Sequence, residues 1–106
     1  MGMYVLADSC NREISLNWFD SLEEAKSALV DEYESVNRIE DGEISEDGMS
    51  AWCTARYSDN DWLIEEIPVA DHLRGGLEKF KSTTGWRRLG AENAIKAFIR
   101  FIEEEA

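Results

Sequence analysis

Residues Met49 to Pro68 read MSAWCTARYSDNDWLIEEIP, and this stretch has the pattern of a β-hairpin. Apolar and polar residues alternate along 49–57, with Ala51 and Cys53 pointing one way and Trp52 the other. Residues 58–61 read SDND and predict the turn, and the second arm, rich in β-formers, ends at Pro68 because proline has no amide to donate. Since a lone hairpin is marginal in water, the sequence predicts further strands and a covering helix.

The residues that precede the hairpin supply both. Two alternating stretches predict strands at 3–8 and 13–19. A helix over 21–36 follows, with Ser21 as its N-cap and Glu24 three residues later, which is the spacing of a capping box. The acidic stretch 37–48 contains two Asp-Gly pairs and predicts a loop, either without regular structure or with a short extended piece around Ile44. We therefore predict an α+β fold, a four-stranded antiparallel sheet (3–8, 13–19, 49–57 and 61–67) with one covering helix.

The chain after Pro68 has a helical pattern. Residues 69–82 are weakly helical, and Gly75-Gly76 predicts a break or a late start of the helix. Residues 83–90 predict a loop and 91–105 a second firm helix, so a C-terminal helical segment should lie beside or beyond the sheet. We expect one domain over 1–106, made of an acidic αβ core (1–68) and this segment (69–106). The apolar stripe of the last helix is wide for a sheet that one helix already covers, which suggests a homodimer; the stripe is Ile95, Phe98, Ile99 and Ile102.

The negative charge is concentrated in the first two thirds of the chain. The formal net charge is −12, and residues 1–68 carry 17 acidic against 4 basic residues, whereas residues 69–106 carry 6 against 7. Such a field repels nucleic acid and anionic membranes and attracts basic protein surfaces. We therefore expect a basic protein partner, with no binding to nucleic acid alone and none to membranes. The alternative is that the acidity only keeps a small protein soluble.

The residues of catalysis are scarce. His72 is the single histidine, and no Ser-His or Cys-His spacing predicts a nucleophile. The glycines do not form a phosphate-binding pattern, and the acidic stretch 37–48 lacks the ligand spacing of a calcium loop. We expect no enzyme, no cofactor and no metal site. Cys10 and Cys53 predict small buried thiols in a reduced, cytoplasmic protein, and no segment predicts a secretion signal or a membrane span.

Four tryptophans are many for so small a core. Trp18, Trp52 and Trp62 are predicted to pack in it, since aromatic pairs stabilise sheets. Trp86, beside Arg87 and Arg88, has the composition of an interface and is predicted to be exposed.

The order of a strand, the FDSLEEA helix, the acidic loop and the hairpin resembles small proteins carried by phages and conjugative elements of gut bacteria. The resemblance covers Leu16 to Ile67. Size, acidity and this mobile-element character are shared with anti-CRISPR proteins and with DNA-mimic antirestriction proteins. The resemblance implies a class of activity, which is inhibition of a bacterial defence nuclease. It assigns no role to any individual residue.

The leading hypothesis is therefore a protein-binding inhibitor whose acidic surface blocks the nucleic-acid-binding surface of a CRISPR effector or restriction nuclease. The alternative is a non-inhibitory interaction module of a phage or mobile element. The predicted partner-binding residues are Glu23, Glu24, Asp31, Glu32 and Glu34 on the helix, Glu40, Asp41, Glu43, Glu46 and Asp47 on the loop, and Trp86 and Arg87.

Overall fold

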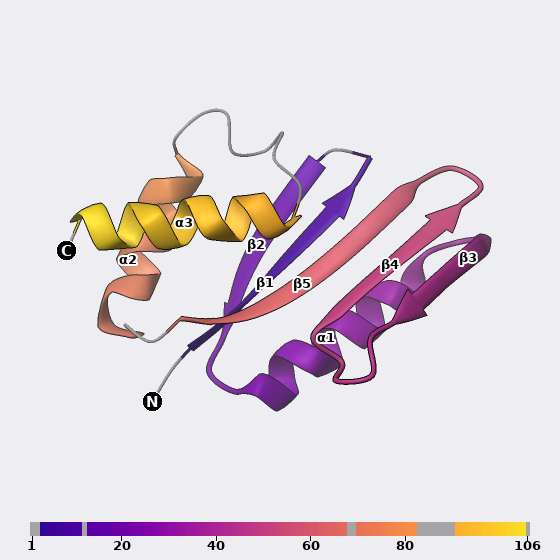
Figure 1. The fold of residues 1–106 in the computed structure, drawn as a ribbon, viewed down its shortest axis with the longest axis horizontal. Helices are drawn as coiled ribbons and strands as arrows, with labels where there is room; N and C mark the ends of the chain where they lie inside the picture. Colours follow the sequence, from indigo (N-terminus) through magenta and orange to yellow (C-terminus); the bar gives the residue numbers. More distant parts are fainter. Residues whose placement is uncertain (1–2, 12, 68–69, 83–90, 106) are drawn as a thin grey trace.

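The computed structural model describes residues 3–11, 13–67, 70–82 and 91–105, and a five-stranded antiparallel sheet forms its centre (Figure 1). The strands are β1 (Met3–Cys10), β2 (Glu13–Phe19), β3 (Ile39–Ile44), β4 (Ser50–Ala55) and β5 (Asp59–Ile67). Their order in the sheet is β2-β1-β5-β4-β3, so the first strand pairs with the last. The α+β class is confirmed, but the sheet has one strand more than the four predicted.

The additional strand is β3, in the stretch that was predicted to be a loop. Ile39 and Ile44, at its two ends, pack against the core cluster under the first helix. Gly42 lies between them where a Cβ atom would come within 2.7 Å of Cys53 Cβ and 2.5 Å of Tyr33 Oη. The Asp41-Gly42 pair is therefore a place of close packing within a strand, and not the turn that this dipeptide predicts.

The helix α1 (Leu22–Ser35) covers one face of the sheet (Figure 1). It begins as predicted, because Ser21 is the N-cap and its Oγ accepts a hydrogen bond from Glu24 N at 3.1 Å. Leu29 is fully buried, and the ring of Tyr33 lies 5.6 Å from that of Trp62. Trp62 therefore belongs to the core, as the sequence predicted.

The helices α2 (Ala70–Lys81) and α3 (Ala91–Glu105) cover the opposite face, over β1, β2 and part of β5 (Figure 1). The predicted break at Gly75-Gly76 is wrong, since α2 runs through both glycines. Two glycines cost a helix roughly 2 kcal/mol relative to alanine. Packing offsets that cost, because Phe80 is buried against α3 with its ring 5.4 Å from that of Phe98.

The apolar stripe of α3 is largely occupied by the chain's own core. Ile95 is 1% exposed and Phe98 is fully buried, in the cluster that includes Val5 and Leu16. The sheet thus has a helical layer on each face, which removes the reason for expecting an uncovered stripe. A homodimer through α3 stays a prediction; Ile99 is half-buried, and the side chain of Ile102 lies outside the described part.

The hairpin turn lies earlier than predicted, because Asp59 and Asn60 already belong to β5. Asn60 is buried and donates hydrogen bonds to Ser58 Oγ at 2.8 Å and to Cys53 Sγ at 3.8 Å. Both cysteines are free thiols. Cys53 is buried as predicted, with its pKa raised by burial, whereas Cys10 is exposed at the end of β1, contrary to the prediction.

Candidate binding groove

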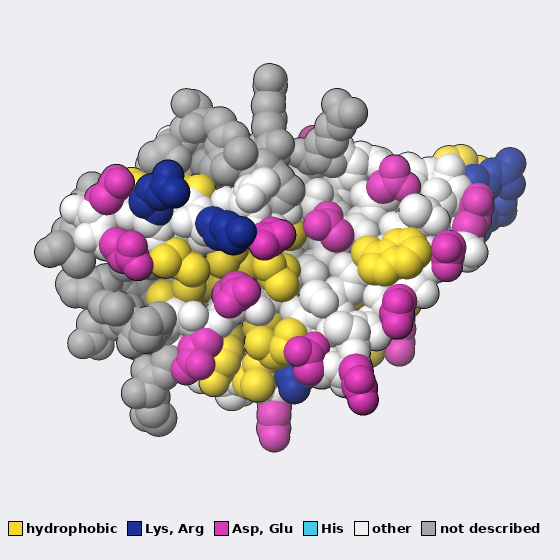
Figure 2. All heavy atoms as spheres, viewed as in Figure 1, with side chains coloured by type: hydrophobic (Ala, Val, Ile, Leu, Met, Phe, Trp, Pro, Cys, Tyr) yellow, Lys and Arg dark blue, Asp and Glu magenta, His cyan; other side chains and the backbone are white. Residues whose placement is uncertain are grey.

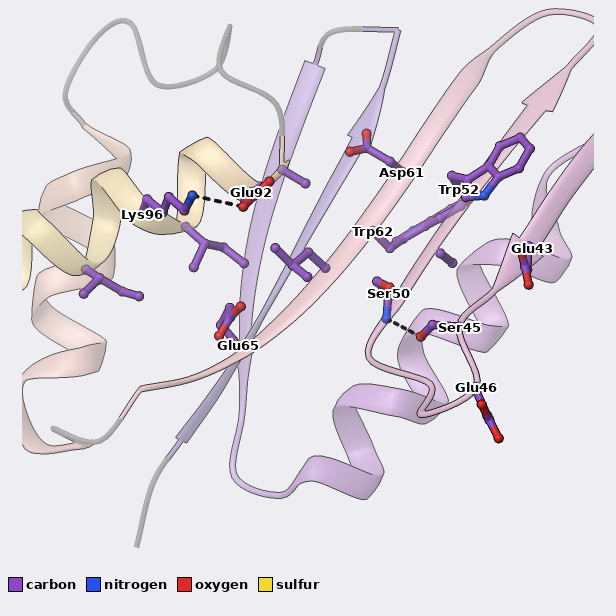
Figure 3. Close-up of a pocket in the computed structure, with 15 residues that line it drawn as sticks. Glu43, Ser45, Glu46, Ser50, Trp52, Asp61, Trp62, Glu65, Glu92 and Lys96 are labelled. Atoms are coloured by element: carbon purple, nitrogen blue, oxygen red, sulfur yellow. Dashed lines mark hydrogen bonds and ion pairs between the residues drawn. The ribbon is translucent and has the colours of Figure 1, made fainter.

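A groove lies between α3 and the half of the sheet that no described helix covers on this face (Figure 3). Its volume is about 940 Å³, and we call it the acidic groove. Among the described residues, five acidic and one basic side chain line it. The lining residues are Glu43, Ser45, Glu46, Ser50, Ala51, Trp52, Asp61, Trp62, Leu63, Glu65, Ala91, Glu92, Ile95, Lys96 and Ile99.

The middle of the acidic groove has apolar surface. Leu63 and Ile99 are half-buried beside the core cluster that β1 and α3 share. Trp52 is 43% exposed, so the prediction that it packs in the core is wrong. Figure 2 shows acidic side chains arranged around apolar surface on this side of the molecule. The groove thus combines an apolar floor with a negatively charged rim.

The strand register places Trp52 between two carboxylates. Trp52 pairs with Glu43 on β3 and with Asp61 on β5, so the three residues form one row across the sheet (Figure 3). Directly opposite residues in antiparallel strands have Cβ atoms about 4.5–5.5 Å apart and point to the same face. The indole is therefore exposed next to two acidic residues of the sheet, and the Asp61 side chain is directed toward the first turn of α3 (Figure 3).

Asp61 also holds α3 against the sheet. Burial raises the pKa of its carboxyl group, while hydrogen bonds from the Ser9 side chain and the Ala91 backbone oppose that increase. Ala91 is the first residue of α3, where an acidic side chain interacts favourably with the free amide groups and the helix dipole. Asp61 thus links the edge of the groove to the position of its helical wall.

The rim contains one described ion pair. Lys96 Nζ lies 3.0 Å from Glu92 Oε1 on α3, and both side chains are about two-thirds exposed (Figure 3). An exposed pair of this kind contributes little to stability. Both groups are therefore free to change partners when a charged ligand approaches.

A second, smaller cavity of about 380 Å³ lies on the α1 side of the sheet, between the end of β1 and the end of α1. Asp8 and Glu32 line it and hydrogen-bond to each other. Burial, together with the hydrogen bond and the charge of Asp8, raises the pKa of Glu32 to about 8. Glu32 is therefore more readily protonated than an ordinary carboxyl group and contributes less negative charge to the predicted acidic surface.

The predicted partner-binding residues do not form one surface. Glu43 and Glu46 line the acidic groove, and Asp41 is exposed two residues before Glu43 on β3, opposite Thr54. The exposed acidic residues of α1 lie over the other face of the sheet; they are Glu23, Glu24, Asp31 and Glu34. Glu40 is exposed at a register shift in β3, and Trp86 and Arg87 lie outside the described residues.

Asp47 has a structural role that the sequence did not reveal. Its Oδ1 accepts hydrogen bonds from Ser45 Oγ at 2.6 Å and Met49 N at 3.0 Å, within the turn that joins β3 to β4. These bonds lower the pKa of Asp47. Gly48, with φ of +72°, completes the turn, so this Asp-Gly pair behaves as the sequence predicted.

Of the residues that line the groove, the sequence analysis predicted only Glu43 and Glu46; those it missed include Trp52, Asp61, Glu65 and Glu92. The signal for Trp52 was present, since the alternation placed it on the polar side of its strand with Ser50 and Thr54. Asp61 was assigned to the predicted turn. No signal in the sequence could have shown that Glu92 lines the same groove as residues of β4.

No match was found to a protein-family model, to a curated protein or to a solved structure. Within the described ranges, no group of three or more His, Cys, Asp or Glu residues is arranged to hold a metal ion. None of the helices, over the same residues, is long and apolar enough to cross a membrane.

Proposed function

We propose that this protein binds a basic surface of another protein through the acidic groove. The observation that supports the proposal is the composition of the groove, where five acidic side chains surround apolar surface and an exposed tryptophan. Interfaces commonly have an apolar, aromatic centre and a polar rim. The sign of the charge selects a partner rich in lysine and arginine, and attracts it at long range.

The finer form of the proposal is inhibition of a bacterial defence nuclease. Nucleases that hold DNA or RNA have basic channels, which an acidic protein can occupy in place of the phosphates. The resemblance to small proteins of phages and mobile elements favours a CRISPR effector or a restriction nuclease as the target. The protein acts without chemistry of its own and binds the nuclease rather than its nucleic acid.

The alternative is an interaction module without inhibitory activity, in which the acidity serves solubility alone. The acidic residues of α1 favour it, since Asp31 and Glu34 are exposed on the side of the sheet away from the groove. The acidic residues of the groove and the acidic residues of α1 can therefore be compared directly for their effect on function. If the groove is functional, the position of each charged residue matters. Solubility depends only on the total charge.

The test uses two double variants with the same change in charge. Glu43→Lys with Glu46→Lys alters the groove, and Asp31→Lys with Glu34→Lys alters the outer side of α1. DNA cleavage by a CRISPR effector and by a restriction endonuclease, each with its nucleic acid, is measured with increasing protein at several salt concentrations. We expect the groove variant to lose inhibition and the α1 variant to keep it. Salt should weaken inhibition by wild type, because exposed charges are screened over about 8 Å at physiological ionic strength.

Two results would count against the proposal. Equal loss of inhibition in both variants would show that total charge matters and the groove does not. Absence of inhibition by wild type would remove the nuclease from the proposal, and failure to bind any basic peptide, tested below, would remove the groove.

A further inference from the structure

Trp52 has a chemical environment that a core residue would not have. It projects from β4 on the open face of the sheet, while its neighbours Ala51 and Cys53 are buried on the α1 face. Ser50 and Thr54, two residues away on either side along the same face, are small and polar. Among the described residues no aromatic ring is recorded against the indole. Burial therefore does not account for a tryptophan at this position.

The neighbours of the indole specify the charge of a ligand. Glu43 and Asp61 lie on the two adjacent strands, directly opposite Trp52. Adjacent strands are about 4.8 Å apart, so the two acidic residues flank Trp52 along the row, and the Asp61 carboxylate is directed toward Ser9 and Ala91. A cation within about 6 Å of a tryptophan ring is attracted by its π face. A cation that contacts the ring and the two carboxylates gains both interactions together.

The shape of the site favours one kind of cation. A guanidinium group is flat, stacks on aromatic rings and donates N–H groups outward in its own plane. Resting on the indole, it can direct those donors toward carboxylates on both sides. An ammonium group is compact and strongly hydrated, and it cannot stack. A carboxylate offers about four acceptor positions, so Asp61 retains acceptors after bonding to Ser9 and Ala91.

We propose that the acidic groove recognises an arginine side chain of a basic protein segment, stacked on Trp52 and held between Glu43 and Asp61. The inference rests on the proposed function, since it names the ligand of the same groove. The rest of the segment lies toward α3, where Leu63, Ile95 and Ile99 supply apolar contacts and Glu65 and Glu92 further acceptors. The partner is thus a segment that joins arginine to apolar residues.

The test compares two peptides with wild type and two variants. The probes are acetylated, amidated hexa-arginine and hexa-lysine, which have equal charge, and binding is measured by calorimetry at low and physiological salt. Trp52→Leu removes the indole. Tyr57→Leu is the matched control, because Tyr57 is a 70% exposed aromatic residue outside the groove. Thermal midpoints verify that both variants are folded.

We expect wild type to bind hexa-arginine about three- to tenfold more tightly than hexa-lysine, the range that one cation–π contact supplies. Trp52→Leu should bring the two affinities together, while Tyr57→Leu should preserve the difference. In an NMR spectrum of the indole N–H groups, the resonance that is missing from Trp52→Leu should be the one that hexa-arginine shifts most.

Each contrary result has its own meaning. Equal affinity for the two peptides in wild type, with no effect of Trp52→Leu, would overturn arginine recognition and leave a groove that binds basic partners by charge alone. Tighter binding of hexa-lysine than of hexa-arginine would overturn it in favour of an ammonium ligand. Failure of both peptides to bind at low salt would overturn the proposed function along with the inference.

Discussion

Replacing Glu32 by glutamine should remove a pH-dependent loss of stability. In the folded protein Glu32 is half-buried, hydrogen-bonded to Asp8, and has its pKa raised from an ordinary 4.5 to about 8. A carboxyl group with a raised pKa favours the folded state while it is protonated. Its contribution is complete below about pH 4.5 and is lost as the pH increases through 8. Glutamine imitates the protonated form, because its amide N–H can donate to Asp8 at every pH.

The size of the effect follows from the difference between the pKa of Glu32 in the unfolded protein and its pKa in the folded protein. A pKa shift of about 3.5 units corresponds to a ceiling of about 5 kcal/mol in the free energy of unfolding. Solvent reaches a half-buried pair and screens it, so we expect about 1–2 kcal/mol. Wild type and Glu32→Gln should therefore have similar stability at pH 5, and the variant should be more stable by about 1–2 kcal/mol at pH 8.5.

Urea unfolding at pH 5, 7 and 8.5 measures this difference. Glu34→Gln is the matched control, because it removes the same charge from an exposed position two residues further along α1. Its difference from wild type should not vary with pH. A Glu32→Gln curve that stays parallel to wild type from pH 5 to 8.5 would refute the reasoning and show that Glu32 is ionised in the folded protein.

Three further predictions concern packing, a turn and nucleic acid. Gly42→Ala should lower the free energy of unfolding by about 1–3 kcal/mol, because the added methyl group would meet Cys53 Cβ and the backbone oxygen of Trp52; a wild-type urea midpoint would contradict it. Asp47→Ala should increase hydrogen exchange at Met49 and Ser50, whereas Glu46→Ala in the same turn should not; equal protection in both would exclude the role assigned to the Asp47 carboxylate. In a low-salt gel shift, micromolar protein should leave DNA and RNA unshifted, because the net charge of −12 opposes binding to phosphate, and a retarded band would contradict this.

The parts of the fold that the sequence predicted were those with local signals. Ser21 and the periodic apolar residues predict α1, and α3 spans the residues 91–105 that its apolar stripe predicted. β3 was missed because Asp41-Gly42 has the composition of a turn, whereas its glycine is needed by close contacts with Cys53 and Trp52 on the neighbouring strand. The break predicted in α2 failed for a similar reason, since Phe80 packs on a helix that the local sequence does not reveal.

The candidate site was predicted only as a region of negative charge. The acidic residues of α1 and of β3 are close in sequence, but α1 lies on one face of the sheet and the groove opens on the other. Which face a helix covers depends on pairing between distant strands. The row of Glu43, Trp52 and Asp61 depends on the register of three strands at once, and a single sequence does not contain that register.

The pairing of β1 with β5 has a consequence for how the chain assembles. Met3 pairs with Ile67 and Cys10 with Asn60, so one edge of the first strand has no partner until two thirds of the chain is present. During synthesis β1 and β2 can form a hairpin early, and β3, β4 and β5 can form a second unit later, each from neighbouring segments. The pairing of β1 with β5, which joins these two units, then forms late. Until it forms, Val5 and Leu6 lie on an unpaired strand edge where another nascent chain could pair.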